Sequence, residues 1–416
     1  MLETLGIHYE PHILTVMGLV IAVAFLTGKA FQRLGIPQVL GYIVAGLFLG
    51  GSFFNAVPPE LADQLTLVSE IALGLIGFDI GSHLRFGELR KLGRSIAFIL
   101  LAESLGAFLL VTVGVYFITQ SLYAALIFGA VAAATDPAAT VGVLSEYDSK
   151  GPLTTSLLAV VGMDDGLALL IYSIAAIFAE SLLLGTGMPT LFQIVALPLF
   201  EIGGSILLGV GLGAALNLLL KRLNRRLDAM VACIGLLLLG IGLSQALELS
   251  FILTSMILGM FVVNRSPERG LQVRYTIERA GPVIYTLFFA LVGARVQLSL
   301  LPTLGLLGLG YVLLRSVGKL GGAWLGGTVG RAEPVVRSNL GFGLLSQAGV
   351  AIGLALTSYD RFCECGEEGE ALGLLVVSVV TASTFVLQII GPLGAKFAIS
   401  RAGEIGRASA EDDAWG

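Results

Sequence analysis

Charged residues are scarce in this chain. Asp, Glu, Lys and Arg together make up 13% of its 416 residues, whereas they make up about 25% of a typical soluble domain. Hydrophobic residues make up 56%, and the mean hydropathy is +0.92. This composition excludes an ordinary soluble domain and favours a protein that spans a lipid bilayer.

Cysteine and basic clusters are also scarce. The three cysteines are Cys233, Cys363 and Cys365, which are too few for a disulfide framework or a zinc site. A net charge of −5 without a basic tail argues against a nucleic-acid partner. The N-terminal segment contains Glu3 and Glu10 but no Lys or Arg, so we interpret the first apolar stretch as a retained span rather than a cleaved signal peptide.

Long apolar stretches run through the whole sequence. A membrane-spanning helix needs about 20 mostly apolar residues, and the pattern predicts an all-α polytopic membrane protein with thirteen transmembrane helices. The predicted spans are 12–32, 35–52, 66–84, 95–118, 122–146, 152–182, 190–220, 227–247, 250–264, 281–299, 304–328, 336–357 and 370–395.

The distribution of Lys and Arg orients these spans, because both residues accumulate in cytoplasmic loops. With the N-terminus outside, 20 of the 24 basic residues fall in inner loops. Arg361 alone falls in an outer loop, and Arg295, Arg315 and Lys319 lie within predicted spans. The sequence therefore predicts an inner-membrane protein with its N-terminus outside, its C-terminus in the cytoplasm, a transporter unit over 1–401 and a short tail over 402–416.

Thirteen spans divide into two six-helix inverted repeats around a single span. The fifth and twelfth spans then correspond, and both contain helix-breaking segments, ATDP at 134–137 and LSQAG at 345–349. Proline removes a backbone donor, and broken helices at membrane depth line cavities. Corresponding breaks in the two halves point to a transport site, so Thr135, Asp136, Ser346 and Gln347 are candidate site residues.

Two adjacent acids, Asp164 and Asp165, interrupt the apolar sixth span. Ionisable residues inside a span cost several kcal/mol and usually mark an ion pathway. Neighbouring helical residues point about 100° apart, so one carboxylate can line the ion route while a basic residue holds the other. A carboxylate there can bind either a proton or Na⁺, and competition for one site is sufficient for antiport. The alternative is a purely structural pair, satisfied by amides or hydroxyls.

Asp136 has two possible roles. It can bind the ion directly, or it can cap the half-helix that follows it, and we favour capping. In either case Thr135 can offer a hydroxyl or carbonyl oxygen to the ion.

The bases of the eleventh span need acidic partners. We expect Arg315 to pair with Asp164 or Asp136, and Glu103 is the alternative. Lys319 lies one turn further on the same face; it can reach the same acids or snorkel to the interface. Glu103, like Asp79, is left open between structural pairing and ion access.

Five segments, in order, resemble the monovalent cation:proton antiporter superfamily over nearly the whole chain. They are LGIPQVLGYIVAGLFLG, AAATDPAAT, GMDDG, LLRSVGKLGGAWLG and LLSQAGVAIGLAL. The resemblance implies an elevator transporter, usually a homodimer. It also implies crossed broken helices in a core domain (95–182 and 304–395) and a separate dimer domain (12–84 and 190–299).

The resemblance also implies site roles. Asp165 is the ion- and proton-binding carboxylate with Asp164 as its neighbour, Thr135 and Asp136 lie in the crossing, and Arg315 is the basic residue of the eleventh span. The Ser346-Gln347 pair is similar to the potassium-efflux variant.

Two branches of this superfamily are mixed in the sequence. Adjacent acids resemble the branch that is often electrogenic, whereas Thr-Asp-Pro resembles the electroneutral branch. Electrogenic members commonly have Lys where Arg315 stands, and Arg cannot release its proton. The electroneutral branch tends to have Glu where Val160 stands. We favour electroneutral exchange.

The predicted function is exchange of Na⁺ or Li⁺ for protons, without enzymatic activity and without a cofactor other than the transported ion. Asp165, Asp164 and Thr135 are the expected Na⁺ ligands, and Arg315 or Lys319 is expected to hold Asp164. The Ser346-Gln347 pair makes K⁺/H⁺ exchange or K⁺ efflux the alternative. An intramembrane aspartyl protease would need acids facing each other in a Gly-x-Gly-Asp setting, which GMDDG lacks, and no pore loop suggests a channel.

Overall fold

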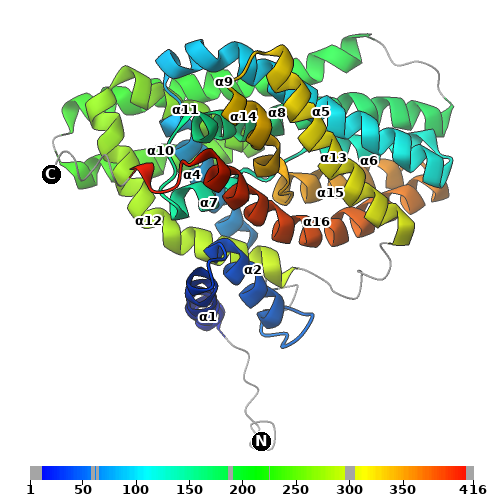
Figure 1. The fold of residues 1–416 in the computed structure, drawn as a ribbon, viewed down its shortest axis with the longest axis horizontal. Helices are drawn as coiled ribbons and strands as arrows, with labels where there is room; N and C mark the ends of the chain where they lie inside the picture. Colours follow the sequence, from blue (N-terminus) through cyan, green and yellow to red (C-terminus); the bar gives the residue numbers. More distant parts are fainter. Residues whose placement is uncertain are drawn as a thin grey trace, which may run out of the picture.

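The fold is a bundle of helices (Figure 1). The computed structural model describes residues 12–57, 61, 65–185, 191–223, 225–295 and 305–408, and within these ranges it contains helices and no β-strand. The all-α prediction is confirmed. The helices are α1 (Ile13–Arg33), α2 (Gln38–Leu49), α4 (Thr66–His83), α5 (Phe86–Thr119), α6 (Leu122–Ala133), α7 (Pro137–Glu146), α8 (Pro152–Leu184), α9 (Leu191–Arg222), α10 (Arg226–Ala246), α11 (Phe251–Arg265), α12 (Pro267–Ala294), α13 (Gly305–Val329), α14 (Pro334–Asn339), the 3₁₀ helix η3 (Leu340–Leu344), α15 (Gly349–Cys363) and α16 (Glu367–Ala402).

Each predicted span overlaps one of these helices or a helix pair. Within the described residues, seven helices are long and apolar enough to cross a membrane, and the pair Pro334–Leu344 and Gly349–Cys363, bent by 51°, makes an eighth. Three apolar helices are shorter, namely α2, α11 and the segment Gly281–Ala294 of α12. The helical membrane fold therefore agrees with the sequence, while the exact number of thirteen spans stays a prediction.

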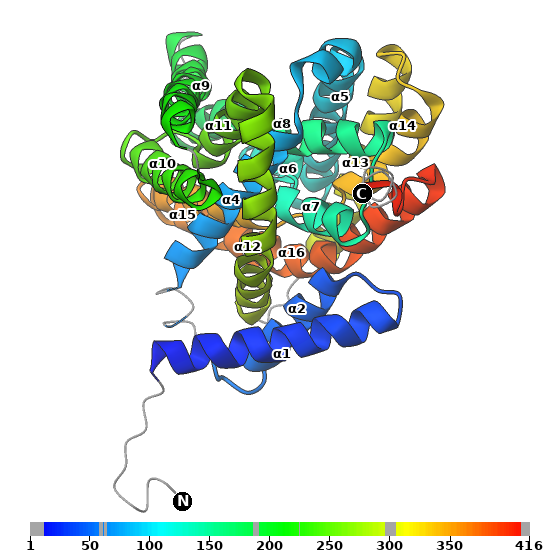
Figure 2. The ribbon, with the colours of Figure 1, turned by 90° about the vertical axis from the view of Figure 1, so that its left-hand side faces the viewer.

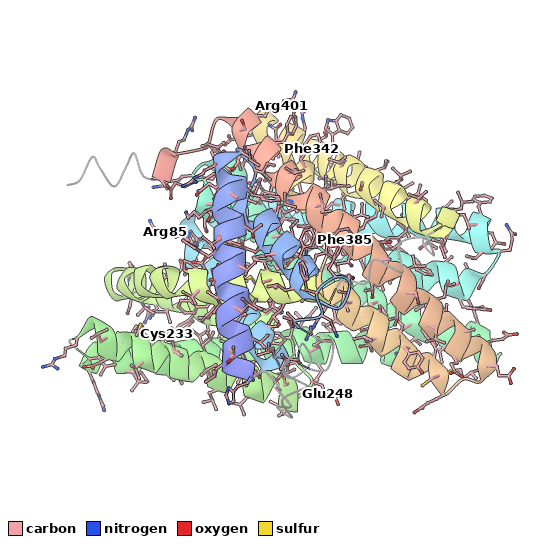
Figure 3. The ribbon with its side chains drawn as sticks, turned by 90° about the horizontal axis from the view of Figure 1, so that it is seen from below. Arg85, Cys233, Glu248, Phe342, Phe385 and Arg401 are labelled. Carbon is pink, nitrogen blue, oxygen red and sulfur yellow. The ribbon has the colours of Figure 1, made fainter. Side chains whose placement is uncertain are left out.

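Buried apolar side chains gather in separate clusters. One joins α5, α6, α8, α13, α15 and α16, and another joins α4, α9, α10, α11 and α12. A third cluster links α1 and α2 to α12; α1 lies along the lower side of the molecule in Figure 2 and crosses the face nearest the viewer in Figure 3. A further cluster bridges the first two groups through α2, α4, α7 and α8.

Helices α5 and α13 pack backbone to backbone, and they run side by side in Figure 1. The α13 glycines recur every fourth residue at 318, 322 and 326. A Cβ atom added at Gly318 would lie 2.6 Å from the Cα of Ala107, and one at Gly322 would lie 2.5 Å from the Cα of Glu103. Small residues allow such close approach between membrane helices. This contact therefore brings the charged residues of α13 against Glu103.

The long helix α8 is anchored at its N-terminus by a residue that follows α16. Glu404 is 1% exposed, and its carboxylate accepts hydrogen bonds from the amides of Leu153 and Thr154, both at 2.8 Å, and from the Thr154 hydroxyl at 2.6 Å. The amides of Gly406 and Ala408 also donate to carbonyls of the α7–α8 connection. A carboxylate at a helix N-terminus satisfies free amides and is favoured by the helix dipole. The start of the predicted tail is therefore part of the folded unit.

This anchor yields a stability prediction. We expect Glu404→Ala to destabilise the protein by roughly 1–3 kcal/mol, because it leaves buried amides of α8 unpaired. Thermal unfolding in detergent measures the effect as a lower midpoint. Glu364→Ala, which removes an exposed acid, is the control, and equal midpoints for the two variants would show that Glu404 does not anchor α8.

Candidate ion-binding site

The first helix break separates α6 from α7 at Ala134–Asp136. Proline cannot donate a backbone hydrogen bond and disfavours helical geometry in the residue before it, and Asp136 is accordingly extended, with φ −86° and ψ 106°. Pro137 then opens α7 at the position where proline is best tolerated. The break thus follows directly from the Thr-Asp-Pro sequence.

The second break separates η3 from α15 at Leu345–Ala348, and it lies directly against the first. The Asp136 amide donates to the Ser346 carbonyl at 3.1 Å, and the Ser346 hydroxyl donates to the Asp136 carbonyl at 3.1 Å. A Cβ atom added at Gly391 of α16 would lie 2.5 Å from the Cα of Ser346. The two breaks, 210 residues apart in sequence, therefore meet at one buried point.

Asp136 caps α7, which was the favoured of its two roles. One carboxylate oxygen accepts from the Ala138 amide at 3.0 Å, and the other accepts from the Gln388 side-chain amide of α16 at 2.7 Å. Both oxygens are thus engaged by the protein, and Asp136 holds the N-terminal end of a half-helix.

Arg315 has a different partner from the one expected. Its guanidinium donates to the carbonyls of Ala134 at 2.7 Å, Leu345 at 2.8 Å and Ser346 at 3.0 Å. These carbonyls end the two broken helices, where intrahelical donors are absent and the helix dipoles are negative. Within the described residues these helix ends, rather than an acid, balance the buried arginine.

Lys319 is the base that contacts Asp164. Its ammonium lies 3.0 Å from Asp164 Oδ2 and 2.5 Å from Glu103 Oε2, and it also donates to the Ala133 carbonyl. The Ser104 hydroxyl lies 2.7 Å from Asp164 Oδ1 and 2.9 Å from Glu103 Oε1. All four of these side chains are fully buried. Of the two bases that the sequence left open, the structure brings Lys319 to Asp164.

Asp165 stands apart from this network. It is 6% exposed, and neither of its carboxylate oxygens accepts a hydrogen bond from the described residues. Buried polar atoms in native proteins are nearly always paired. Asp164, Asp136 and Lys319 lie close enough to Asp165 to interact with it electrostatically. The buried Thr135 lies beside Asp164. An unpaired buried carboxylate next to oxygen-bearing neighbours can bind a proton or a hard cation, since such cations prefer oxygen ligands.

The remaining candidate residues support the crossing. The Gln347 side-chain amide donates to the Val131 carbonyl and to the Tyr311 hydroxyl, both at 2.9 Å, and Ser346 bonds to Asp136 as described above. Asp79, which the sequence left open, pairs with His83 one turn along α4 at 3.5 Å. Glu103 is the residue that sequence reasoning left open and the structure brings into the site. Its signal was an acid in an apolar span, and the partner that the sequence offered for it was Arg315 rather than Lys319.

Comparisons with known proteins agree with this architecture. The family model "Sodium/hydrogen exchanger, transmembrane" matches residues 19–394. The chain is 25% identical, over 83% of each chain, to the ammonium/H⁺ antiporter subunit AmhT of Alkalihalophilus pseudofirmus. It is 27% identical to the Na⁺/H⁺ antiporter NhaP of Pseudomonas aeruginosa over 42% of each chain.

A solved structure has the same fold. The sodium proton antiporter MjNhaP1 of Methanocaldococcus jannaschii at pH 8 superposes with a TM-score of 0.67 over 96% of each chain, at 18% identity. An electron-microscopy structure of MjNhaP1 superposes with a TM-score of 0.74 over 93% of this chain.

The contacts of Arg315 lead to a test of the crossing. We expect Arg315→Lys to lower the unfolding temperature, because a single ammonium cannot reproduce the planar fork that reaches carbonyls of both helix breaks. Thermal unfolding in detergent and circular dichroism measure the loss. Arg361→Lys, at a half-exposed pair with Glu180, is the matched control, and an unchanged midpoint for Arg315→Lys would contradict this role.

Proposed function

The chain belongs to the sodium/hydrogen exchanger family, whose members are membrane transporters, and on this premise we propose that it exchanges Na⁺ or Li⁺ for protons across the cell inner membrane. The observation that carries the proposal is Asp165, a buried carboxylate without a hydrogen-bond partner among the described residues. Because protons and Na⁺ compete for this group, binding of one displaces the other.

Asp165 is the proposed ion and proton carrier, with Asp164 and Thr135 as further Na⁺ ligands. Asp164 is held by Lys319 at 3.0 Å, and this contact keeps a second carboxylate oriented beside the ion route. Arg315 and Asp136 keep the two helix breaks in register. The site would thus need no cofactor, and its only metal ion would be the transported cation.

Alternating access by an elevator movement is the proposed mechanism. The core domain (95–182 and 304–395) would move against the dimer domain (12–84 and 190–299), and the dimer domain would join two copies of the chain. In the described structure, one polar contact joins these ranges and another joins the dimer domain to Lys396, the residue directly after the core range. The Gln38 amide of α2 donates to Glu146 of α7 at 2.7 Å, and Lys396 of α16 donates to the Gly35 carbonyl. Such a movement would break both contacts.

The net charge moved per cycle depends on the base at the site. The preference for electroneutral exchange was based partly on Arg315, which stands where electrogenic members commonly have Lys and which cannot release its proton. Since Lys319 makes the contact with Asp164, and lysine, unlike arginine, can release a proton, this part of the reasoning no longer supports electroneutral exchange. The measurement below therefore includes the membrane potential.

K⁺/H⁺ exchange is the second candidate, favoured by the similarity of Ser346-Gln347 to the potassium-efflux variant. The relative AmhT is named for ammonium, so NH₄⁺ belongs among the ions to be tested. A protease is disfavoured, because Asp164 and Asp165 are neighbours on α8 rather than acids facing each other from two helices.

Flux in proteoliposomes tests the proposal. We expect Na⁺ and Li⁺ to dissipate an imposed pH gradient, and Asp165→Asn to abolish this exchange because an amide binds neither a proton nor a cation in the same way. Glu180→Gln, which neutralises an acid of the same helix at its pair with Arg361, should retain exchange.

The same vesicles, assayed with K⁺ and NH₄⁺ and with a potential-sensitive dye, separate the candidate ions and the stoichiometries. Full exchange by Asp165→Asn would contradict the assignment of Asp165. Activity with K⁺ but not with Na⁺ would favour the second candidate.

A further inference from the structure

Two carboxyl groups share one ammonium beside the proposed ion carrier. Lys319 lies 2.5 Å from Glu103 and 3.0 Å from Asp164, and all three side chains are 0% exposed. Asp164 therefore has a competitor within the protein for any cation that uses it as a ligand. A cation can bind to Asp164 only if the ion pair between Lys319 and Asp164 weakens.

Lys319 cannot leave Asp164 without another anionic partner. A buried ammonium that loses its counter-charge is strongly destabilised, because the interior does not replace its hydration. Glu103 supplies a second carboxylate at a shorter distance, so the ammonium can shift toward α5 without becoming unpaired.

We propose that Glu103 is a positioning residue of the transport cycle, which takes over Lys319 when the cation binds to Asp164 and Asp165. This inference rests on the proposed function and adds a residue on α5 to the site. Glu103 does not touch the cation. By stabilising Lys319, Glu103 lowers the free energy needed to release Asp164 from Lys319, so that Asp164 can bind the cation.

Ser104 supports the exchange of partners. Its hydroxyl lies 2.7 Å from Asp164 and 2.9 Å from Glu103, and a hydroxyl has a single hydrogen to donate. It can therefore bond to one carboxylate at a time, and a rotation moves this bond from one acid to the other. The two acids are thus linked by a donor as well as by a base.

The packing of α5 against α13 fixes Glu103 and Lys319 relative to each other. A Cβ atom at Gly322 would lie 2.5 Å from the Cα of Glu103, so the two helices are in backbone contact at this level. Asp164 comes from the third helix, α8. Lys319 and Glu103 therefore lie on two helices in backbone contact. Asp164 lies on another helix and is the partner that can turn toward the ion.

Other charged groups around Glu103 do not fill this role. On α13, Arg315 donates to the carbonyls of the two helix breaks. On α8, Asp164 is the partner that Lys319 would leave, and Asp165 would bind the cation. Both carboxylate oxygens of Asp136 already accept hydrogen bonds, from Ala138 and Gln388, and α6 has no charged residue between Leu122 and Ala133. Within the described structure, Glu103 is thus the available second partner for Lys319.

The test is the cation dependence of Glu103→Gln. This variant keeps the shape of the side chain but removes its charge, so Lys319 retains only Asp164 as an anionic partner. We expect the KM for Na⁺ or Li⁺ to rise about tenfold or more, while the rate at saturating cation stays near that of the unsubstituted protein. Glu103→Asp should recover part of the affinity, and Glu180→Gln is the control acid.

A double-variant cycle separates this role from a structural one. In a Lys319→Gln background no ammonium competes for Asp164, so Glu103→Gln should no longer change the KM. Equal effects of Glu103→Gln with and without Lys319 would overturn the proposal. A fall in rate and stability at an unchanged KM would also overturn it, because that is the result of a merely structural residue.

Binding can be read separately from flux. Na⁺ or Li⁺ should raise the unfolding temperature of the detergent-solubilised protein, since a ligand that binds only the folded state stabilises it. Glu103→Gln should shift this response to higher cation concentration. If Glu103→Gln does not fold, Ser104→Ala should produce a smaller shift in the same direction, and an unchanged response would overturn the proposal. A protein that binds cations without exchanging them would contradict the proposed function and leave this inference in place.

Discussion

Unpaired backbone groups at the ends of broken helices are the constraint on which the rest of this structure depends. In a bilayer, polar groups must find partners inside the protein, and two breaks in the membrane-embedded core leave carbonyls and amides without intrahelical bonds. Arg315 satisfies carbonyls of both breaks, and Asp136 satisfies an amide of α7. The crossing can exist because these charges meet the helix ends of opposite sign.

The site follows from how this crossing is held. Arg315 and Lys319 are one turn apart on α13, and the glycines of that helix bring it into backbone contact with α5. Arg315 donates its hydrogen bonds to carbonyls at the helix ends, while Lys319 lies among Glu103, Asp164 and Ser104. Asp165, the next residue on α8, receives none of these contacts. Among the described residues, Lys319 and Ser104 direct their hydrogen bonds to Asp164 and Glu103, and the Asp165 carboxylate is left without a partner.

Structural support for the site extends well beyond it. Helix α8 carries both acids, and its N-terminus is capped by Glu404, some 250 residues further along the chain. Gln388 of α16 holds Asp136 from another side. Residues that bind no ion in this proposal therefore position those that do, and they lie in helices that meet only in the folded protein.

The sequence by itself determined the membrane class, the approximate place of the helices, the two helix breaks and the buried acids, because each of these depends on local composition. Apolar stretches, Thr-Asp-Pro and Asp164-Asp165 can be recognised without knowing what lies opposite them. Tertiary structure alone decided which base meets which acid. Arg315 and Lys319 share a helix face, so spacing could not separate them. Only the tertiary contacts of α13 with the two helix breaks and with Asp164 assigned one base to carbonyls and the other to the acid. The roles of Glu103 and Glu404 were decided in the same way, because Lys319 lies 216 residues from Glu103 and Leu153 lies 251 residues from Glu404, and no local pattern records such a contact.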